Sequence, residues 1–261
     1  MIVITGIIAS VVGLFITGPI QGFLDTSRRA ELVDAAQLAL TRMGRDVRAA
    51  LPNSVRISGS ALEVLLTLDG DRYRVESPGA DDDRLSFAAA DTAFNTLAPL
   101  QLPGGATFPV TASIAIYPLQ QGGADPYDAS DGVMTAAAAI NVTTVTNGGV
   151  TEGRVQLAGA HRFPFDSPTR RVYLVSGPVT YYCNPPQLLR YEGYAVSALQ
   201  AVPPAATPVL IAANVRACSF QYAPGTAQRN AVVSIALSLA DDAALEERIR
   251  LIRQIHVNNA P

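Results

Sequence analysis

The spacing of the apolar residues changes twice along the chain, and these changes divide it into three segments. Residues 1–24 are almost entirely apolar and carry no charged side chain before Asp25. From 25 to 52 apolar residues recur at steps of three and four, the period of an amphipathic helix. From residue 53 onwards, short alternating runs and turn signals indicate β-strands. We therefore expect two halves of one long helix (1–24 and 25–52), followed by a β-rich globular head (53–261).

Residues 1–24 are predicted to form the apolar half of the helix, which lies in a membrane or in the core of a filament. As a helix, the run from Met1 to Thr17 would span roughly 25 Å, slightly less than a bilayer core of about 30 Å. It lacks the cationic start and the small-residue cleavage site of a secretory signal peptide. Gly18 and Pro19 predict a kink, because proline removes one backbone hydrogen bond from a helix.

The second segment predicts an amphipathic helix with one apolar stripe. Proline at 52 ends it, because the residue before a proline disfavours helical angles. We expect the stripe to pack the helix on the head. Its members are Leu32, Ala36, Leu40, Met43 and Val47.

Residues 53–261 are predicted to form many short antiparallel strands joined by turns. Asp69-Gly70 is a hairpin signal between two strand-like runs, and Asn147-Gly148-Gly149 is a second turn signal. Gly177-Pro178 separates two further runs. The predicted fold class is therefore α+β, with a long N-terminal helix packed on a C-terminal antiparallel β-rich head.

The chain contains two cysteines, Cys183 and Cys218. In an exported protein they predict one disulfide, closing a loop worth roughly 3–4 kcal/mol in the chain-entropy model. In a cytosolic protein they would instead be two buried free thiols. The apolar N-terminal segment favours export and therefore the disulfide.

Composition and motifs point away from catalysis and from nucleic acid. The net charge is -3 and no basic stripe is present, which argues against a nucleic-acid partner. No nucleophile elbow, zinc-binding helix, phosphate-binding loop or paired-cysteine motif occurs. The two histidines, His161 and His256, fit exposed strand positions better than catalytic ones. We expect no enzyme activity and no cofactor.

One acidic loop is a weak candidate for calcium. Asp125, Asp128 and Asp131 supply the oxygen ligands that calcium prefers, but their spacing does not match an EF-hand. A solvated turn explains the same residues. The run 81–83 is a second acidic candidate with the same alternative.

Three stretches of the chain resemble a known family. The stretch from Val3 to Ile57 has the apolar helix, the Gly-Pro pair and the amphipathic half of type IV pilins and pseudopilins. It is most similar to MshO-like minor pilins of the MSHA pilus biogenesis system. The stretches Val179–Tyr194 and Arg253–Pro261 are similar to the same group. The family's processing motif (a basic leader, a glycine, then phenylalanine and glutamate) is not found, so Met1 is expected to correspond to the interior of the family's helix.

The resemblance implies a structural subunit that primes a type IV pilus or lies at its tip. It also implies other major and minor pilins, the inner-membrane assembly platform and the lipid bilayer as partners. The expected location is the bacterial inner membrane, single-pass with a periplasmic head, and then the cell-surface pilus. Two alternatives remain: a pseudopilin of a type II secretion system, or a membrane-tethered periplasmic binding domain or hydrolase.

Overall fold

The computed structural model describes residues 2–76, 84–225, 230–241, 248–257 and 259; inside the helix, the side chains of 2–19 and 21 are not described. These residues form one long helix, twelve β-strands and two short 3₁₀ helices. The elements are α1 (Ile2–Arg48), β1 (Arg56–Ser58), β2 (Ala61–Arg72), β3 (Asp91–Thr96), η1 (Pro103–Gly105), β4 (Val110–Ala115), η2 (Ala129–Asp131), β5 (Ala138–Asn147), β6 (Val150–His161), β7 (Arg171–Asn184), β8 (Gln187–Glu192), β9 (Val209–Ala212), β10 (Val215–Ala223), β11 (Ala231–Ala240) and β12 (Arg248–Val257).

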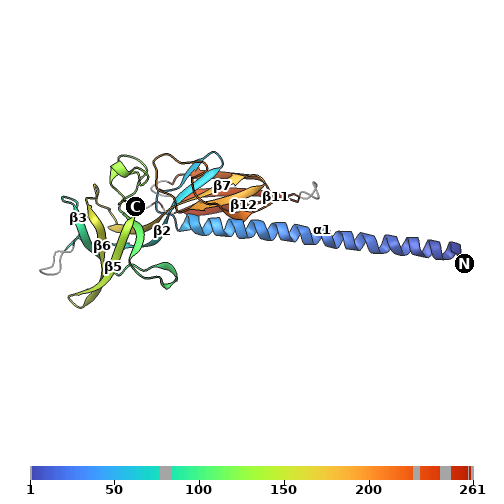
Figure 1. Cartoon of the computed structure of the whole chain (residues 1–261), viewed down its shortest axis with the longest axis horizontal. Helices are drawn as coiled ribbons and strands as arrows, with labels where there is room; N and C mark the ends of the chain where they lie inside the picture. The colour runs from blue at the N-terminus through green and yellow to red at the C-terminus, as the bar shows by residue number, and fades with distance from the viewer. Residues whose placement is uncertain (1, 77–83, 226–229, 242–247, 258, 260–261) are drawn as a thin grey trace.

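Helix α1 is a single rod that extends far beyond the β-strands at its N-terminal end (Figure 1). It continues through Gly18 and Pro19 without a break in helical structure, so the kink predicted there stays a prediction. At its other end the chain turns into the sheet, where the Leu51 N–H donates to the Leu65 carbonyl. Within the described part of the chain, no helix is both long enough and apolar enough to cross a membrane.

The larger sheet contains nine strands. Its main path runs β1-β2-β7-β4-β5-β6-β3, and β8 and β9 extend it beside β7. The pairs along this path are antiparallel. The turn predicted at Asn147-Gly148-Gly149 is confirmed: Asn147 pairs with Val150, and both glycines have the positive φ of a two-residue hairpin loop.

Two glycine signals lie within strands instead of turns. Asp69 and Gly70 lie inside the continuous strand β2, and Gly177 and Pro178 lie inside β7. The two strands pair from Ala61 opposite Tyr182 to Arg72 opposite Arg171, with register shifts on both sides of Thr67. Gly177 borders one of these shifts, whereas Gly70 pairs in regular register with Tyr173. At Gly70 a Cβ atom would lie 2.9 Å from the Tyr173 ring. Gly70 therefore allows the Tyr173 ring to pack closely against the strand and does not form a hairpin turn.

The smaller sheet, β10-β11-β12, lies beside the C-terminal part of α1. From Ala231 to Leu237 alternate residues of β11 are buried, as the strand pattern requires, and they join a cluster that includes the apolar stripe of the helix. From β12, the Arg253 guanidinium donates to the Thr41 hydroxyl at 3.0 Å.

Two main hydrophobic clusters fill the molecule, and both draw on β2 and β7. The first lies between the C-terminal part of α1, the smaller sheet and one end of these strands, and includes Val64 and Tyr181. The second lies at the far end and includes Phe94 and Leu174. A small third cluster includes Leu65, Tyr173 and Val175, which alternate along β2 and β7 with residues of the two main clusters.

The predicted α+β class, with the helix packed on one β-rich head, is wrong. The chain is mostly β-sheet with a single helix, and its strands form two separate sheets. The first part of the amphipathic half is not packed on the strands, because its described side chains before Leu32 are exposed. From Leu32 onwards the helix packs mainly on the smaller sheet, not on one continuous head. Strands β2 and β7 were also predicted too short, because glycines inside them were interpreted as turns.

Candidate functional site

The most unusual surface lies on the projecting part of α1. Ile20, Phe23 and Leu24 occupy adjacent turns of the helix, and all three are exposed, Phe23 by 73%. Large apolar side chains grouped on an exposed helix indicate a surface that another apolar partner covers. This segment contacts no other described element, because the strands begin further along the helix (Figure 1).

The stripe residues Leu32, Ala36, Leu40, Met43 and Val47 are buried, in one cluster with β11 and β12. A polar clamp reinforces this end of the helix. The Arg190 Nε on β8 donates to the Asp46 carboxylate at 2.9 Å, and the Tyr181 hydroxyl donates to the same oxygen at 2.8 Å. Burial is the main cause that raises the pKa of Tyr181, and the negative charge of Asp46 adds to it.

The predicted disulfide between Cys183 and Cys218 is confirmed. It joins β7 of the larger sheet to β10 of the smaller one, beside the first hydrophobic cluster. The two sheets are therefore covalently linked next to the helix.

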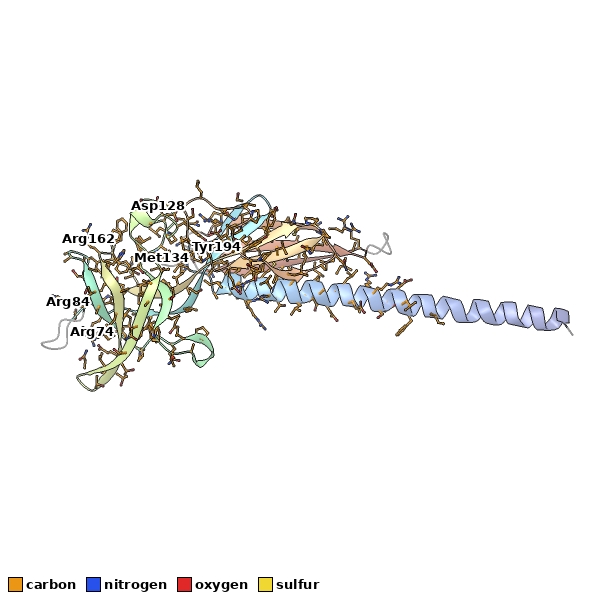
Figure 2. The ribbon with its side chains drawn as sticks, in the orientation of Figure 1. Arg74, Arg84, Asp128, Met134, Arg162 and Tyr194 are labelled. Atoms are coloured by element: carbon orange, nitrogen blue, oxygen red, sulfur yellow. A yellow bond between two sulfur atoms is a disulfide. The ribbon has the colours of Figure 1, made fainter. Side chains whose placement is uncertain are left out.

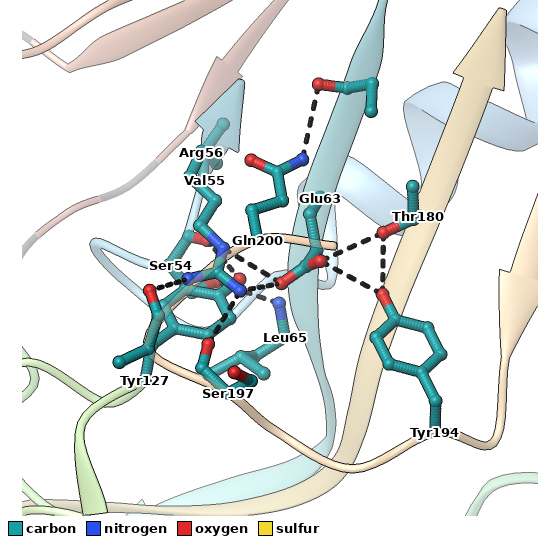
Figure 3. Close-up of polar contacts among 12 residues, drawn as sticks. Ser54, Val55, Arg56, Glu63, Leu65, Tyr127, Thr180, Tyr194, Ser197 and Gln200 are labelled. Atoms are coloured by element: carbon teal, nitrogen blue, oxygen red, sulfur yellow. Dashed lines mark hydrogen bonds and ion pairs between the residues drawn. The ribbon is translucent and has the colours of Figure 1, made fainter. Parts of the chain in front are cut away.

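A buried carboxylate, Glu63 on β2, is the centre of a second feature (Figure 3). Its side chain is 1% exposed. One oxygen accepts from Arg56 Nε at 2.9 Å and Nη2 at 2.6 Å. The other accepts from the Thr180 hydroxyl at 3.0 Å and the Tyr194 hydroxyl at 3.2 Å. Each oxygen of Glu63 thus has two donors.

Arg56 extends this network to two loops. It donates to the backbone carbonyls of Ser197 and Ala198 at 2.8 and 2.9 Å, and its guanidinium lies 3.6 Å from the centre of the Tyr127 ring. Burial raises the pKa of Tyr127, whose hydroxyl donates to the Ser54 carbonyl. Because its groups are paired with one another, this network acts as a junction that holds loops onto β2 and β7.

A similar network stabilises the far end of the molecule. The Glu152 carboxylate pairs with Arg74 and accepts from the side-chain amides of Asn95 and Asn147, both at 3.0 Å. Glu152 is fully buried. The pairing links β3, β5 and β6 to the chain that follows β2.

In the acidic loop that contains Asp125, Asp128 and Asp131, the carboxylates accept hydrogen bonds from backbone N–H groups of the same loop. Asp125 accepts from the Tyr127 N–H, Asp131 accepts from the Asp125 N–H, and Asp128 accepts from the Ser130 N–H. The hydrogen bonds from Ser130 lower the pKa of Asp128. Among the described residues no group of three acidic, histidine or cysteine side chains could hold a metal. Figure 2 shows Asp128 far from the projecting helix. The other acidic run, 81–83, lies outside the described residues.

Among the residues that the structure describes, neither histidine is hydrogen-bonded to an acidic side chain. His161 Nε2 is 2.8 Å from the Gly132 carbonyl, and its ring packs edge-on against Phe163. Asp166, which follows five residues later in the chain, accepts a hydrogen bond from the Tyr73 hydroxyl. His256 is exposed on β12.

A hollow of about 330 Å³ lies at the loop that follows β4. Its walls are mainly apolar and aromatic, and none of the side chains that line it is charged. They are Tyr117, Leu119, Gln121, Gly122, Ala124 and Phe165.

The two buried networks around Glu63 and Glu152 were not predicted from the sequence. The one available signal was Glu63, a single charge within the otherwise apolar run Ala61–Leu66. Its partners come from positions up to 131 residues away, which local patterns cannot bring together.

Comparison with known proteins finds no matching family model, no similar curated protein and no similar solved structure.

Proposed function

We propose that this chain is a structural minor pilin-like subunit for type IV, MSHA-type pilus biogenesis, with a priming or tip position. The observation that carries the proposal is the projecting helix with its exposed group Ile20, Phe23 and Leu24. The resemblance of residues 3–57 to MshO-like minor pilins gives that helix its role. Its partners would be the bilayer before assembly and other pilins afterwards.

The physical argument concerns where such a helix is stable. Fully burying a large apolar side chain is worth about 1.5–3 kcal/mol, so three of them strongly favour transfer out of water. A bilayer or a bundle of similar helices provides that burial, and association in lipid is driven by packing and polar contacts. The membrane location of the chain is part of the proposal.

Two further observations support an exported subunit without catalytic activity. The disulfide between Cys183 and Cys218 is typical of an oxidising compartment. The most elaborate polar network, around Glu63, uses its groups to join loops to strands. A type II secretion pseudopilin would share these features, and the genes beside this one would separate the two systems.

The first test is the mass of the mature N-terminus from native membranes, with and without the prepilin peptidase. The proposal expects a peptidase-dependent, methylated phenylalanine upstream of Met1. The same N-terminus in both strains would contradict it and favour the membrane-tethered periplasmic domain.

A second test uses the exposed helix group directly. Phe23→Asp should release the chain from the membrane fraction and lower the number of assembled pili. Leu199→Asp is the matched control, because Leu199 is 84% exposed but lies on a loop of the β-rich part. Membrane retention of the Phe23 variant with normal pili would refute the proposed role of the helix.

A further inference from the structure

Strand β5 has a neighbour on only one side along much of its length. β4 pairs with it from Ala138 to Ile140, whereas β6 pairs with it from Asn141 to Asn147. The outer side of residues 141–147 therefore carries no strand. This segment lies at the end of the molecule opposite the N-terminus of α1 (Figure 1). We call it the open edge of β5.

The hairpin that joins β5 to β6 determines which backbone groups point outwards. Asn147 and Val150 flank its two-residue loop and are a hydrogen-bonded pair, and the register continues along β5 without a shift. In an antiparallel pair, such residues alternate with residues whose N–H and C=O point away from the partner strand. On the open edge these are Val142, Thr144 and Thr146. Among the described residues, none bonds their outward backbone groups.

The open edge lacks the features that usually prevent an edge strand from pairing. Natural edges are protected by charged side chains, prolines, bulges or a covering segment. The segment reads NVTTVTN, with no charge and no proline, and its β-branched residues favour extended backbone. By contrast, the chain that follows β2 covers the outer edge of β3: the Arg74 N–H donates to the Asn95 carbonyl, and the Leu97 N–H donates to the Arg72 carbonyl.

A hollow of about 410 Å³ lies beside the open edge. Residues 141–144 form one wall, and residues 99–102 and 105–108 of the preceding loop form the other. Leu100 and Phe108 make the loop wall apolar, and both pack in the second hydrophobic cluster. None of the side chains that line the hollow is charged. The space is therefore suited to an uncharged guest.

Two carboxylates on β2 hold the loop wall in place. Asp69 accepts from the Gln101 N–H at 2.7 Å, and Asp71 accepts from the Ala98 N–H at 2.6 Å. The hollow is thus formed before any guest enters, which lowers the cost of ordering on binding.

We propose that the open edge of β5 binds an extended, uncharged peptide segment of a partner protein, which adds to the larger sheet as one further strand. The outward groups of Val142 and Thr144 would bond its backbone, as in other cases of β-strand addition. Side chains on the face shared with Val142 and Phe108 should be apolar, because both residues pack on the second hydrophobic cluster. A charged side chain there would lose water without gaining a partner.

The loop across the hollow favours a single strand over the edge of a second copy's sheet, because a whole sheet would meet residues 105–108. The proposal does not rest on the proposed function.

The first experiment measures binding of a labelled synthetic peptide to the full chain in mild detergent by fluorescence anisotropy. The peptide is Thr-Val-Thr-Val-Thr-Val-Thr with both ends capped. Thr144→Pro should raise its Kd at least about tenfold, because proline removes an outward N–H that the fold itself does not use. Thr144→Ala is the matched control, since it shortens the same side chain and keeps the N–H. Replacing the valines of the peptide by aspartate should also weaken binding.

The second experiment follows amide hydrogen exchange of the unmodified chain by NMR. Without peptide, the amides of Val142 and Thr144 should exchange quickly, and those of Thr143 and Val145, which face β6, slowly. Saturating peptide should slow exchange at Val142 and Thr144 at least about tenfold and leave the other two unchanged. This measurement decides the matter if Thr144→Pro does not fold.

Each opposite result overturns the proposal. Absence of peptide binding, or equal Kd values for Thr144→Pro and Thr144→Ala, removes strand addition at this edge. Slow exchange at Val142 and Thr144 in the free, dilute chain would show that their groups are already bonded. Protection that rises with protein concentration in the absence of peptide would assign the edge to a second copy.

Discussion

Replacing one member of the pair between Arg56 and Glu63 should destabilise the protein strongly and unequally. Glu63 is 1% exposed and Arg56 17%. Removing one partner of such a buried pair costs about 3–5 kcal/mol, because the other charge remains buried without compensation. Arg56→Met leaves the Glu63 carboxylate with only the two hydroxyl donors, so we expect the full cost.

Glu63→Gln should be milder. The amide keeps an oxygen for Thr180 and Tyr194, but its NH2 group cannot accept from Arg56, which keeps the two backbone carbonyls and the Tyr127 ring. A hydrogen bond to a charged group is worth about 1.5–3 kcal/mol, and we expect a loss in that range. The double variant should cost at least about 1 kcal/mol less than the sum of the two single changes.

The assay is urea unfolding of the full chain in mild detergent, followed by circular dichroism, which gives the free energy of unfolding and its slope. Arg48→Met is the control, because Arg48 is exposed and should change stability by less than about 0.5 kcal/mol. A loss below about 1 kcal/mol for Arg56→Met, or simple additivity in the double variant, would refute the interpretation of this network as a coupled junction.

Three more predictions concern the core, the disulfide and alkaline pH. Met43→Asp places an unpaired charge in the first hydrophobic cluster and should lower the free energy of unfolding by several kcal/mol; an unchanged denaturation curve would contradict the burial of Met43. Cys183 and Cys218 should resist alkylation until reduced, and reduction should cost roughly 3–4 kcal/mol; rapid labelling of the unreduced protein would exclude the disulfide. Burial raises the pKa of Tyr127 above its value in the unfolded chain, and four other tyrosines shift the same way. The unfolded state therefore releases protons first, and stability should be complete below about pH 10 and fall above it. An ultraviolet titration should show these tyrosines ionising only as the fold is lost; early, reversible ionisation of all nine would contradict this.

Elements with strong local signals were predictable from the sequence. The three-to-four spacing from Leu32 to Val47 reflects burial on one side of a helix, and the alternation in β11 reflects burial on one face of a sheet. The paired glycines at 148 and 149 require positive φ, so their turn was also predictable. In each case the cause lies within a few neighbouring residues.

Features that depend on distant partners were not predictable. Gly70 signals a turn locally, but its place in β2 depends on the Tyr173 ring more than 100 residues away. Nor could local patterns show that the strands would divide into two sheets. The partners of Glu63 come from three separate segments, and only the folded chain brings them together.

The shared strands β2 and β7 also determine how the molecule loses its structure. Because Leu62 and Val179 belong to the cluster beside the helix while Leu174 belongs to the distal one, neither cluster can melt without removing strand partners from the other. The β-rich part should therefore unfold as one cooperative unit. A substitution that unfolds the second hydrophobic cluster should therefore also weaken the packing of α1 on the first. A pulling force on α1 would be transmitted along β2 and β7 to the second cluster.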